Sequence, residues 1–365
     1  AENAADVTSV RQALGYESWT LYGISYGTRY ALATLRDQPG GTKSVILDSV
    51  VPPQVDLLAD EGASIYASLH AVSAACQAQL DCYNTFGDVE SKQLSILERL
   101  DGSPAELVAS DGSSTEVSAT LAASLFTTLL YSGAAIPYVP EIVQEIYEED
   151  YSLFEQASSP GKDSVVDEAT YLSVICAEEA PFSSAAALAE KSQTIPEPWR
   201  RWVTPERIFD ACAIWDVPSA PALENDAVTN PIPTLVLSGG FDPVTPPAYG
   251  ALAARTLPRS QFITLSDQAH ASSISPCGKT LTHAFLQDPL GRVSAGCVSA
   301  PAAVFKGRGG FSALSATAEA PSAVRFVTTR ERPPAETIKD AMFRASRLRP
   351  ARIEVGATER HRGRR

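Results

Sequence analysis

The pattern of hydrophobic positions predicts four short strands, two near each end of the first 300 residues. The run at 44–48 has an apolar centre, Val45 to Leu47, as expected for a parallel strand that is covered on both faces. Helical patterns follow or precede these runs, and the alternation of strands with helices indicates an α/β fold with a mainly parallel sheet. The predicted strands are residues 19–22, 44–48, 233–238 and 261–265, and the predicted core helices are 1–14, 28–36, 246–257 and 279–287.

The long segment between the second and third strands lacks this alternation of strands with helices, and its hydrophobic pattern predicts helices alone. An insertion of this size between two core strands is expected to form a helical lid over the site. The chain is therefore divided into a first part of the core at 1–52, a lid at 53–230, a second part of the core at 231–300 and a tail at 301–365. The predicted lid helices are residues 61–80, 89–100, 117–131, 139–157, 166–176, 184–192 and 205–213.

A Gly-x-Ser-x-Gly pattern, from Gly23 to Gly27, lies between a predicted strand and a predicted helix. In this context the pattern is typical of a nucleophile elbow, a strained turn that exposes a serine at the carboxyl end of a sheet. The two glycines leave room for the backbone to reverse. Ser25 is thus a candidate nucleophile, and the backbone N–H of Tyr26 is a candidate oxyanion donor. A Gly/Ser turn without chemistry is the alternative for the pattern alone.

Two further residues complete a catalytic set. Asp242 and His270 each lie just past a predicted strand. The order Ser, Asp, His, with every residue at a strand end, is the order of the α/β-hydrolase triad. The sequence therefore predicts an α/β-hydrolase fold with Ser25, Asp242 and His270 as catalytic residues. Asp48, which ends another strand, is predicted to cap a loop, with the role of a substitute triad acid as the alternative.

The net charge of −14 is unevenly distributed along the chain. Residues 301–365 contain 14 Lys and Arg against 6 Asp and Glu, whereas residues 1–300 contain 15 against 37. The acidic body argues against nucleic-acid binding. The basic tail, rich in Ala, Arg, Pro, Ser and Thr, is predicted to be mostly disordered, with a helix at 335–347, and to contribute nothing to the fold. A basic arm that binds acidic surfaces and a segment foreign to the fold are the alternatives.

The six cysteines include no C-x-x-C pair, which argues against a zinc ribbon or a thioredoxin-type site. Disulfides would predict an oxidising, extracytoplasmic compartment, whereas six buried free thiols in a cytosolic protein are the alternative. The sequence contains no run of about 18 apolar residues and no signal peptide, so no membrane span is expected and any export signal would precede this sequence. Of the 15 pairings, the spacing favours Cys76–Cys82, Cys176–Cys212 and Cys277–Cys297.

Several segments of the first 300 residues resemble the secreted tripeptidyl and prolyl aminopeptidase family of α/β-hydrolases, with its TAP-like C-terminal domain. The resemblance implies a serine exopeptidase that cleaves near the free amino terminus of a peptide. Such a site needs negative charge to hold the ammonium group, and Glu178 and Glu179 suit that role, with a solvated helix face as the alternative. The family usually has glycines around His270, where this chain has Ala269 and Ala271. The matching segments are Glu2 to Asp6, Leu21 to Thr28, Val45 to Pro53, Cys176 to Phe182, Phe241 to Pro247, and the cysteines at 277 and 297.

The predicted chemistry is acyl transfer without a metal or an organic cofactor. His270 takes the proton from Ser25, and Asp242 fixes the tautomer of His270 and stabilises its cationic form. Ser25 attacks the scissile carbonyl, and water then releases the acyl-enzyme. The expected partner is a peptide with a free amino terminus. An esterase or lipase-like hydrolase with the same triad, and a catalytically incomplete hydrolase, are the alternatives.

Members of the family that this chain resembles have further strands before the segment that corresponds to residues 1–14. They also have, in that earlier part, a loop with a second oxyanion donor. Because they are not in this sequence, the strand at 19–22 is expected to lie at an edge of the sheet. Weak or no turnover is expected, since the loss of one oxyanion donor lowers the rate by roughly 10²–10³-fold.

Overall fold

The computed structural model describes residues 2–108, 114–152, 168–203, 207–294, 296–299 and 304–311. Its larger sheet has four parallel strands in the order β1-β2-β5-β6, so β1 is an edge strand of the described sheet. All four predicted strands are confirmed, and their carboxyl ends meet at one edge because they run parallel. The strands are β1 (Trp19–Ile24), β2 (Thr42–Asp48), β5 (Thr234–Gly239) and β6 (Ser260–Leu265).

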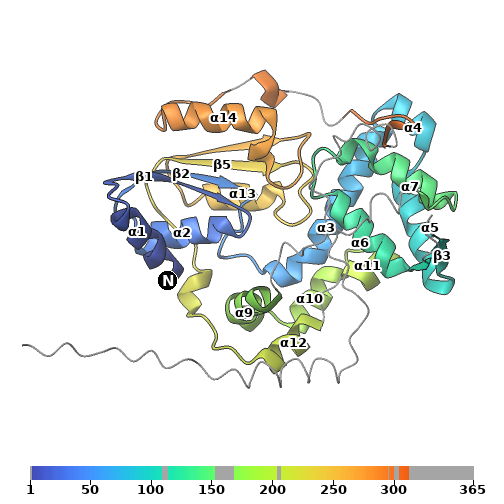
Figure 1. The fold of residues 1–365 in the computed structure, drawn as a ribbon, viewed down its shortest axis with the longest axis horizontal. Coiled ribbons are helices and arrows are strands. Elements are labelled where there is room, and N and C mark those ends of the chain that lie inside the picture. Colours follow the sequence, from blue (N-terminus) through green and yellow to red (C-terminus); the bar gives the residue numbers. More distant parts are fainter. Residues whose placement is uncertain are drawn as a thin grey trace, which may run out of the picture. The chain divides into compact units, whose positions relative to one another are not determined.

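Helices cover both faces of this sheet (Figure 1). On one face Leu32 of α2 packs in a cluster with Val45, and on the other Phe285 of α14 packs with Ile46. Val45 and Ile46 are consecutive, so their side chains point to opposite faces, and both are fully buried. Burial on both faces explains why the centre of β2, Val45 to Leu47, is apolar. A parallel sheet covered by helices on both faces agrees with the predicted α/β-hydrolase fold. The core helices are α1 (Glu2–Ala13), α2 (Gly27–Asp37), α13 (Pro247–Ala254) and α14 (Pro276–Gln287).

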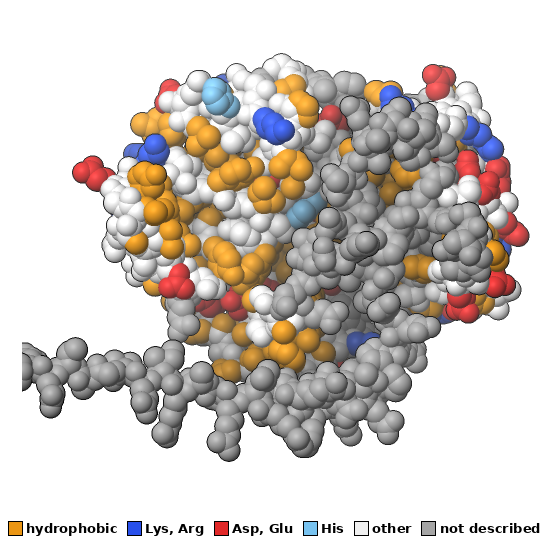
Figure 2. All heavy atoms as spheres, viewed as in Figure 1, with side chains coloured by type: hydrophobic (Ala, Val, Ile, Leu, Met, Phe, Trp, Pro, Cys, Tyr) orange, Lys and Arg blue, Asp and Glu red, His pale blue; other side chains and the backbone are white. Residues whose placement is uncertain are grey.

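Most of a further hydrophobic cluster lies in residues 53–230, the segment that we call the lid, and α3 takes a central place in it. Leu69 and Val72 of α3 are buried in this cluster together with Phe126 and Trp199. On the face shown in Figure 2, acidic side chains gather at the outer side of the lid helices. Residues 153–157 of the helix predicted at 139–157 lie outside the described residues. The lid helices are α3 (Leu57–Gln77), α4 (Leu80–Phe86), α5 (Val89–Gly102), α6 (Ala119–Leu129), α7 (Val139–Tyr147), α9 (Glu168–Glu178), α10 (Ala185–Ser192), α11 (Glu197–Val203) and α12 (Arg207–Trp215).

The lid also contains a β-hairpin, which corrects the prediction of helices alone. Strands β3 (Ala105–Val108) and β4 (Ser114–Val117) pair in antiparallel fashion. The helix predicted at 117–131 begins only at Ala119, because the side chain of Ser118 caps it by accepting a hydrogen bond from the N–H of Leu121. Helices α4 and α11 were likewise not predicted from the sequence.

Residues 304–311 pack on the lid, so the prediction that nothing after residue 300 contributes to the fold is wrong for this segment. Phe305 and Phe311 pack against the hydrophobic cluster of the lid. The fully buried carboxylate of Glu141 on α7 accepts hydrogen bonds from the backbone N–H groups of Gly309 and Phe311. These two bonds satisfy a carboxylate that would otherwise be buried at a high cost.

A chain that ends at residue 299 is therefore expected to lose stability, by roughly 3 kcal/mol, because two aromatic contacts disappear and Glu141 loses its N–H donors. A chain that ends at Phe311 keeps these contacts and is the matched control. Thermal unfolding of both chains, measured against the full chain, checks this expectation. Equal melting temperatures for the two shortened chains would contradict it. The other tail predictions, disorder over 312–365 and a helix at 335–347, lie outside the described residues.

The six cysteines are joined in the three predicted pairs. These disulfides tie α3 to α4, α9 to α12, and α14 to a short 3-10 turn, η5 (Gly296–Ser299). Each one restricts the unfolded chain and so stabilises the native state. None of the described helices combines the length and the apolar character that a membrane crossing requires. The pairs are Cys76–Cys82, Cys176–Cys212 and Cys277–Cys297.

Candidate active site

Ser25 lies in the sharp turn between β1 and α2. Its φ of 56° is in the left-handed region, which costs a non-glycine residue free energy and is typical of a nucleophile elbow. The N–H of Ser25 donates to the carbonyl of Asp48, 3.0 Å away, which ties the turn to the end of β2. A Cβ at Gly23 would lie 2.4 Å from the carbonyl oxygen of Gly27, so the turn requires glycine at position 23.

Asp242 and His270 meet at the same edge of the sheet. The Nδ1 atom of His270 lies 2.9 Å from Oδ2 and 3.1 Å from Oδ1 of Asp242. The Asp242 carboxylate also accepts hydrogen bonds from the backbone N–H groups of Val244 and Thr245 and, at 2.7 Å, from the hydroxyl of Thr245. This network holds the carboxylate in place and leaves Nε2 of His270 to act on a substrate or nucleophile.

The electrostatics of this pair favour a charged carboxylate and a basic imidazole. Burial alone would raise the pKa of Asp242, but the hydrogen bonds and charge of His270 and the hydrogen bonds of Thr245 outweigh it and lower that pKa. Burial alone would lower the pKa of His270, but the hydrogen bond and charge of Asp242, with a smaller contribution from Asp48, raise it. A carboxylate that raises the pKa of its histidine makes that histidine a stronger general base.

Ser25 follows β1, and Asp242 and His270 follow β5 and β6, so all three lie at the same edge of the parallel sheet, but the hydrogen-bond chain between them is incomplete. No hydrogen bond joins Ser25 to His270, although both residues belong to the described part of the chain. In a structure without substrate, catalytic hydrogen bonds are often long and tighten only when substrate binds. The backbone N–H of Tyr26, at the start of α2, forms no hydrogen bond with any described residue, so it stays a candidate oxyanion donor.

Asp48 caps the turn that follows His270. Its fully buried carboxylate accepts a hydrogen bond from the hydroxyl of Ser272 at 2.8 Å, and bonds from both the N–H and the hydroxyl of Ser273. Burial raises the pKa of Asp48 against the opposing effect of these hydrogen bonds. The structure thus gives Asp48 the loop-capping contacts that were predicted, while Asp242 holds the position next to His270.

Ala271, next to His270, is held in a left-handed conformation with a φ of 59°. Glycine adopts this conformation without a steric cost, so Ala271→Gly is expected to stabilise the protein by about 0.5–1 kcal/mol. Ala269 has no such conformation, and Ala269→Gly, the matched control, should destabilise. Chemical denaturation of both variants checks this, and a loss of stability in Ala271→Gly would contradict it.

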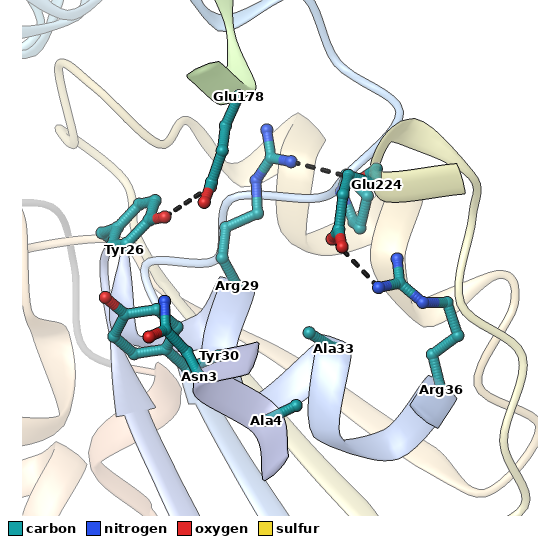
Figure 3. Close-up of a pocket in the computed structure, with 10 residues that line it drawn as sticks. Asn3, Ala4, Tyr26, Arg29, Tyr30, Ala33, Arg36, Glu178 and Glu224 are labelled. Atoms are coloured by element: carbon teal, nitrogen blue, oxygen red, sulfur yellow. Dashed lines mark hydrogen bonds and ion pairs between the residues drawn. The ribbon is translucent and has the colours of Figure 1, made fainter. Parts of the chain in front are cut away.

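Glu178, predicted to bind the substrate ammonium group, already has a partner. It accepts a hydrogen bond of 2.5 Å from the hydroxyl of Tyr26 (Figure 3). Burial, together with this bond and the charge of Glu178, raises the pKa of Tyr26. The two side chains help to line a cavity of about 30 Å³, between α1, α2 and the end of α9, which has room for little more than a water molecule.

Glu179, the second residue predicted for that role, is 3 % exposed and forms an ion pair with Arg29, which is 7 % exposed. The Nη2 atom of Arg29 lies 2.5 Å from Oε1 of Glu179. The burial of this pair does not agree with a solvated helix face, which was the alternative to a binding role. This geometry therefore does not favour Glu179 as the residue that binds the substrate. Its carboxylate pairs with Arg29 of α2 and so holds the end of α9 against α2.

Three lid and loop residues near the site were not identified from the sequence. Thr245 supports Asp242, and only the local spacing Asp-Pro-Val-Thr could have indicated it. The ring of Tyr131, just after α6, lies edge-on to His270 with 5.4 Å between ring centroids. Glu61, on α3, lies within electrostatic range of Tyr131. Neither Tyr131 nor Glu61 lies in a motif, since their proximity to the site depends on how the lid packs.

Comparison with known proteins places this geometry among hydrolases. Residues 203–293 match the family described as TAP-like protein. Serine protease Hip1 of Mycobacterium tuberculosis and of Mycobacterium bovis is 24 % identical over 297 residues, which cover 73 % of this chain and 55 % of the relative. The chain thus spans about half the length of the curated relatives that it matches.

The solved structures to which this chain is similar include a meta-cleavage product hydrolase and an α/β hydrolase. The meta-cleavage product hydrolase CumD aligns with a TM-score of 0.33 at 14 % identity over 78 % of this chain and 70 % of its own. MGS-M2, from a deep-sea metagenome library, aligns with a TM-score of 0.34 at 14 % identity over 80 % of this chain and 72 % of its own.

Proposed function

We propose that this α/β hydrolase is a serine exopeptidase that acts on the free amino termini of peptides. The observation that supports this most is the hydrogen bond between His270 and Asp242 at the sheet edge where the strained turn presents Ser25. His270 removes the proton of Ser25, which attacks the scissile carbonyl, and Asp242 stabilises the imidazolium that forms. The N–H of Tyr26 stabilises the oxyanion. No metal or organic cofactor takes part in this scheme.

The choice of peptides as substrates rests on similarity to a serine protease and to the TAP-like family. The choice of free amino termini rests on the sequence resemblance alone. The three disulfides support an extracytoplasmic location, because such bonds persist in oxidising compartments.

The test measures kcat/KM of the full chain for three compounds: a tripeptide p-nitroanilide, its amino-terminally acetylated form, and a p-nitrophenyl ester. The proposal expects kcat/KM for the free tripeptide to exceed that for the acetylated form by at least tenfold. Equal hydrolysis of the two peptides would contradict the exopeptidase assignment. Hydrolysis of the ester alone would identify an esterase instead.

A further inference from the structure

One face of α3 lies against the loop that carries Asp242. The hydroxyl of Ser68 donates a hydrogen bond of 2.6 Å to the carbonyl of Phe241, the residue before Asp242. Glu61 precedes Ser68 by seven residues, and seven residues of an α-helix turn through about 700°, so the two side chains leave the helix roughly 20° apart. Glu61 therefore lies on the same face of α3, about two turns before Ser68, and is directed toward the catalytic side of the lid.

The carboxylate of Glu61 has no partner of its own. It forms no hydrogen bond and no ion pair with any described residue, whereas its neighbour Asp60 pairs with Lys191 at 2.8 Å and accepts from Tyr249 at 3.1 Å. Burial raises the pKa of Glu61 to about 7, and no cation among the described residues opposes this. Glu61 is half-buried, and a carboxylate that is partly shielded from water is often paired. An unpaired carboxylate on the face of α3 that lies toward the catalytic loop indicates that a positively charged ligand binds there.

Two tyrosines from other lid elements lie within electrostatic range of this carboxylate. Burial raises the pKa of Tyr171, on α9, to about 12, and the charge of Glu61 adds to that rise. Burial and the charge of Glu61 likewise raise the pKa of Tyr131, the residue whose ring lies edge-on to His270. The tyrosines are 44 % and 43 % exposed, so a ligand can reach both of them.

We propose that Glu61, with the rings of Tyr131 and Tyr171, binds the ammonium group at the amino terminus of the peptide substrate. A carboxylate supplies the opposite charge, and aromatic rings attract a cation to their faces. This inference rests on the proposed exopeptidase function and specifies its substrate site. Glu178 and Glu179 are less suited to the role, because Tyr26 and Arg29 already hold them.

Binding to a chain that cannot turn over the peptide tests this site directly. In the Ser25→Ala chain, isothermal titration calorimetry with tri-alanine amide and with N-acetyl-tri-alanine amide gives a ratio of dissociation constants. The free peptide is expected to bind at least tenfold more tightly. Adding Glu61→Gln should reduce that ratio to within twofold, whereas the matched control Glu178→Gln should leave it unchanged. Thermal unfolding of Glu61→Gln verifies the fold, and its melting temperature should equal or exceed that of the parent, because an unpaired carboxylate is removed.

The proposal is overturned if Glu61→Gln leaves the ratio unchanged, if Glu178→Gln abolishes it, or if the two peptides bind equally to the parent. Failure of the proposed function is recognised separately, by the absence of Ser25 acylation in the unsubstituted chain. A chain that is acylated at Ser25 but does not distinguish the two peptides is a serine hydrolase without this ammonium site.

Discussion

Asp242→Asn is expected to lower kcat by about 10⁴-fold while leaving the fold intact. An amide cannot hold His270 in the tautomer that accepts the proton of Ser25, and it carries no charge to stabilise the imidazolium. The charge of Asp242 also raises the pKa of His270. Its loss should lower that pKa, so the acid limb of the pH–rate profile should move to lower pH. Hydrolysis of an activated ester between pH 5 and 9 measures both effects.

Asp48→Asn is the matched control for this experiment, because Asp48 is the other buried carboxylate whose charge acts on His270. Its hydrogen bonds go to Ser272 and Ser273, so this substitution should mainly lower stability. A larger loss of kcat in Asp48→Asn than in Asp242→Asn would identify Asp48 as the triad acid and contradict the assignment.

Glu179→Ala is expected to destabilise the protein by about 3–5 kcal/mol, because it leaves the guanidinium of Arg29 buried without its carboxylate. Glu178→Ala removes only the hydrogen bond from Tyr26 and should cost about 1 kcal/mol. Urea denaturation of both variants gives the comparison. Similar costs for the two substitutions would show that the Arg29–Glu179 pair is not the contact that holds α9 to α2.

The sheet and the strand-end residues could be predicted from the sequence because each follows from local pattern. Burial on both faces makes the centres of β2 and β5 apolar, at Val45 to Leu47 and at Leu235 to Leu237. Parallel strands bring their carboxyl ends to one edge, which places the turn at Ser25, the Asp242 carboxylate and the His270 ring in the same region. The serine turn was recognisable because its geometry requires Gly23.

The lid was harder to predict because its contacts join segments far apart in the chain. Glu178 and Glu179 are adjacent acidic residues, and nothing local distinguishes the one that pairs with Arg29 from the one that contacts Tyr26. The position of Glu61 follows only from the packing of α3 against the catalytic loop.

The packing of residues 304–311 could not be predicted from local pattern either. Its composition is that of a loop, with three glycines and two basic residues, and only Phe305 and Phe311 indicate packing. The carboxylate that receives it, Glu141, lies more than 160 residues earlier in the sequence. A contact of this kind has no sequence periodicity by which to recognise it.

The most direct test of the central claim is acylation of Ser25 by a fluorophosphonate probe, followed by mass analysis of the peptides. We expect the full, folded chain to be labelled at Ser25, Ser25→Ala to remain unlabelled, and Asp242→Asn to react much more slowly. Labelling at any other residue would contradict the account, as would the absence of labelling in a chain whose thermal unfolding is cooperative.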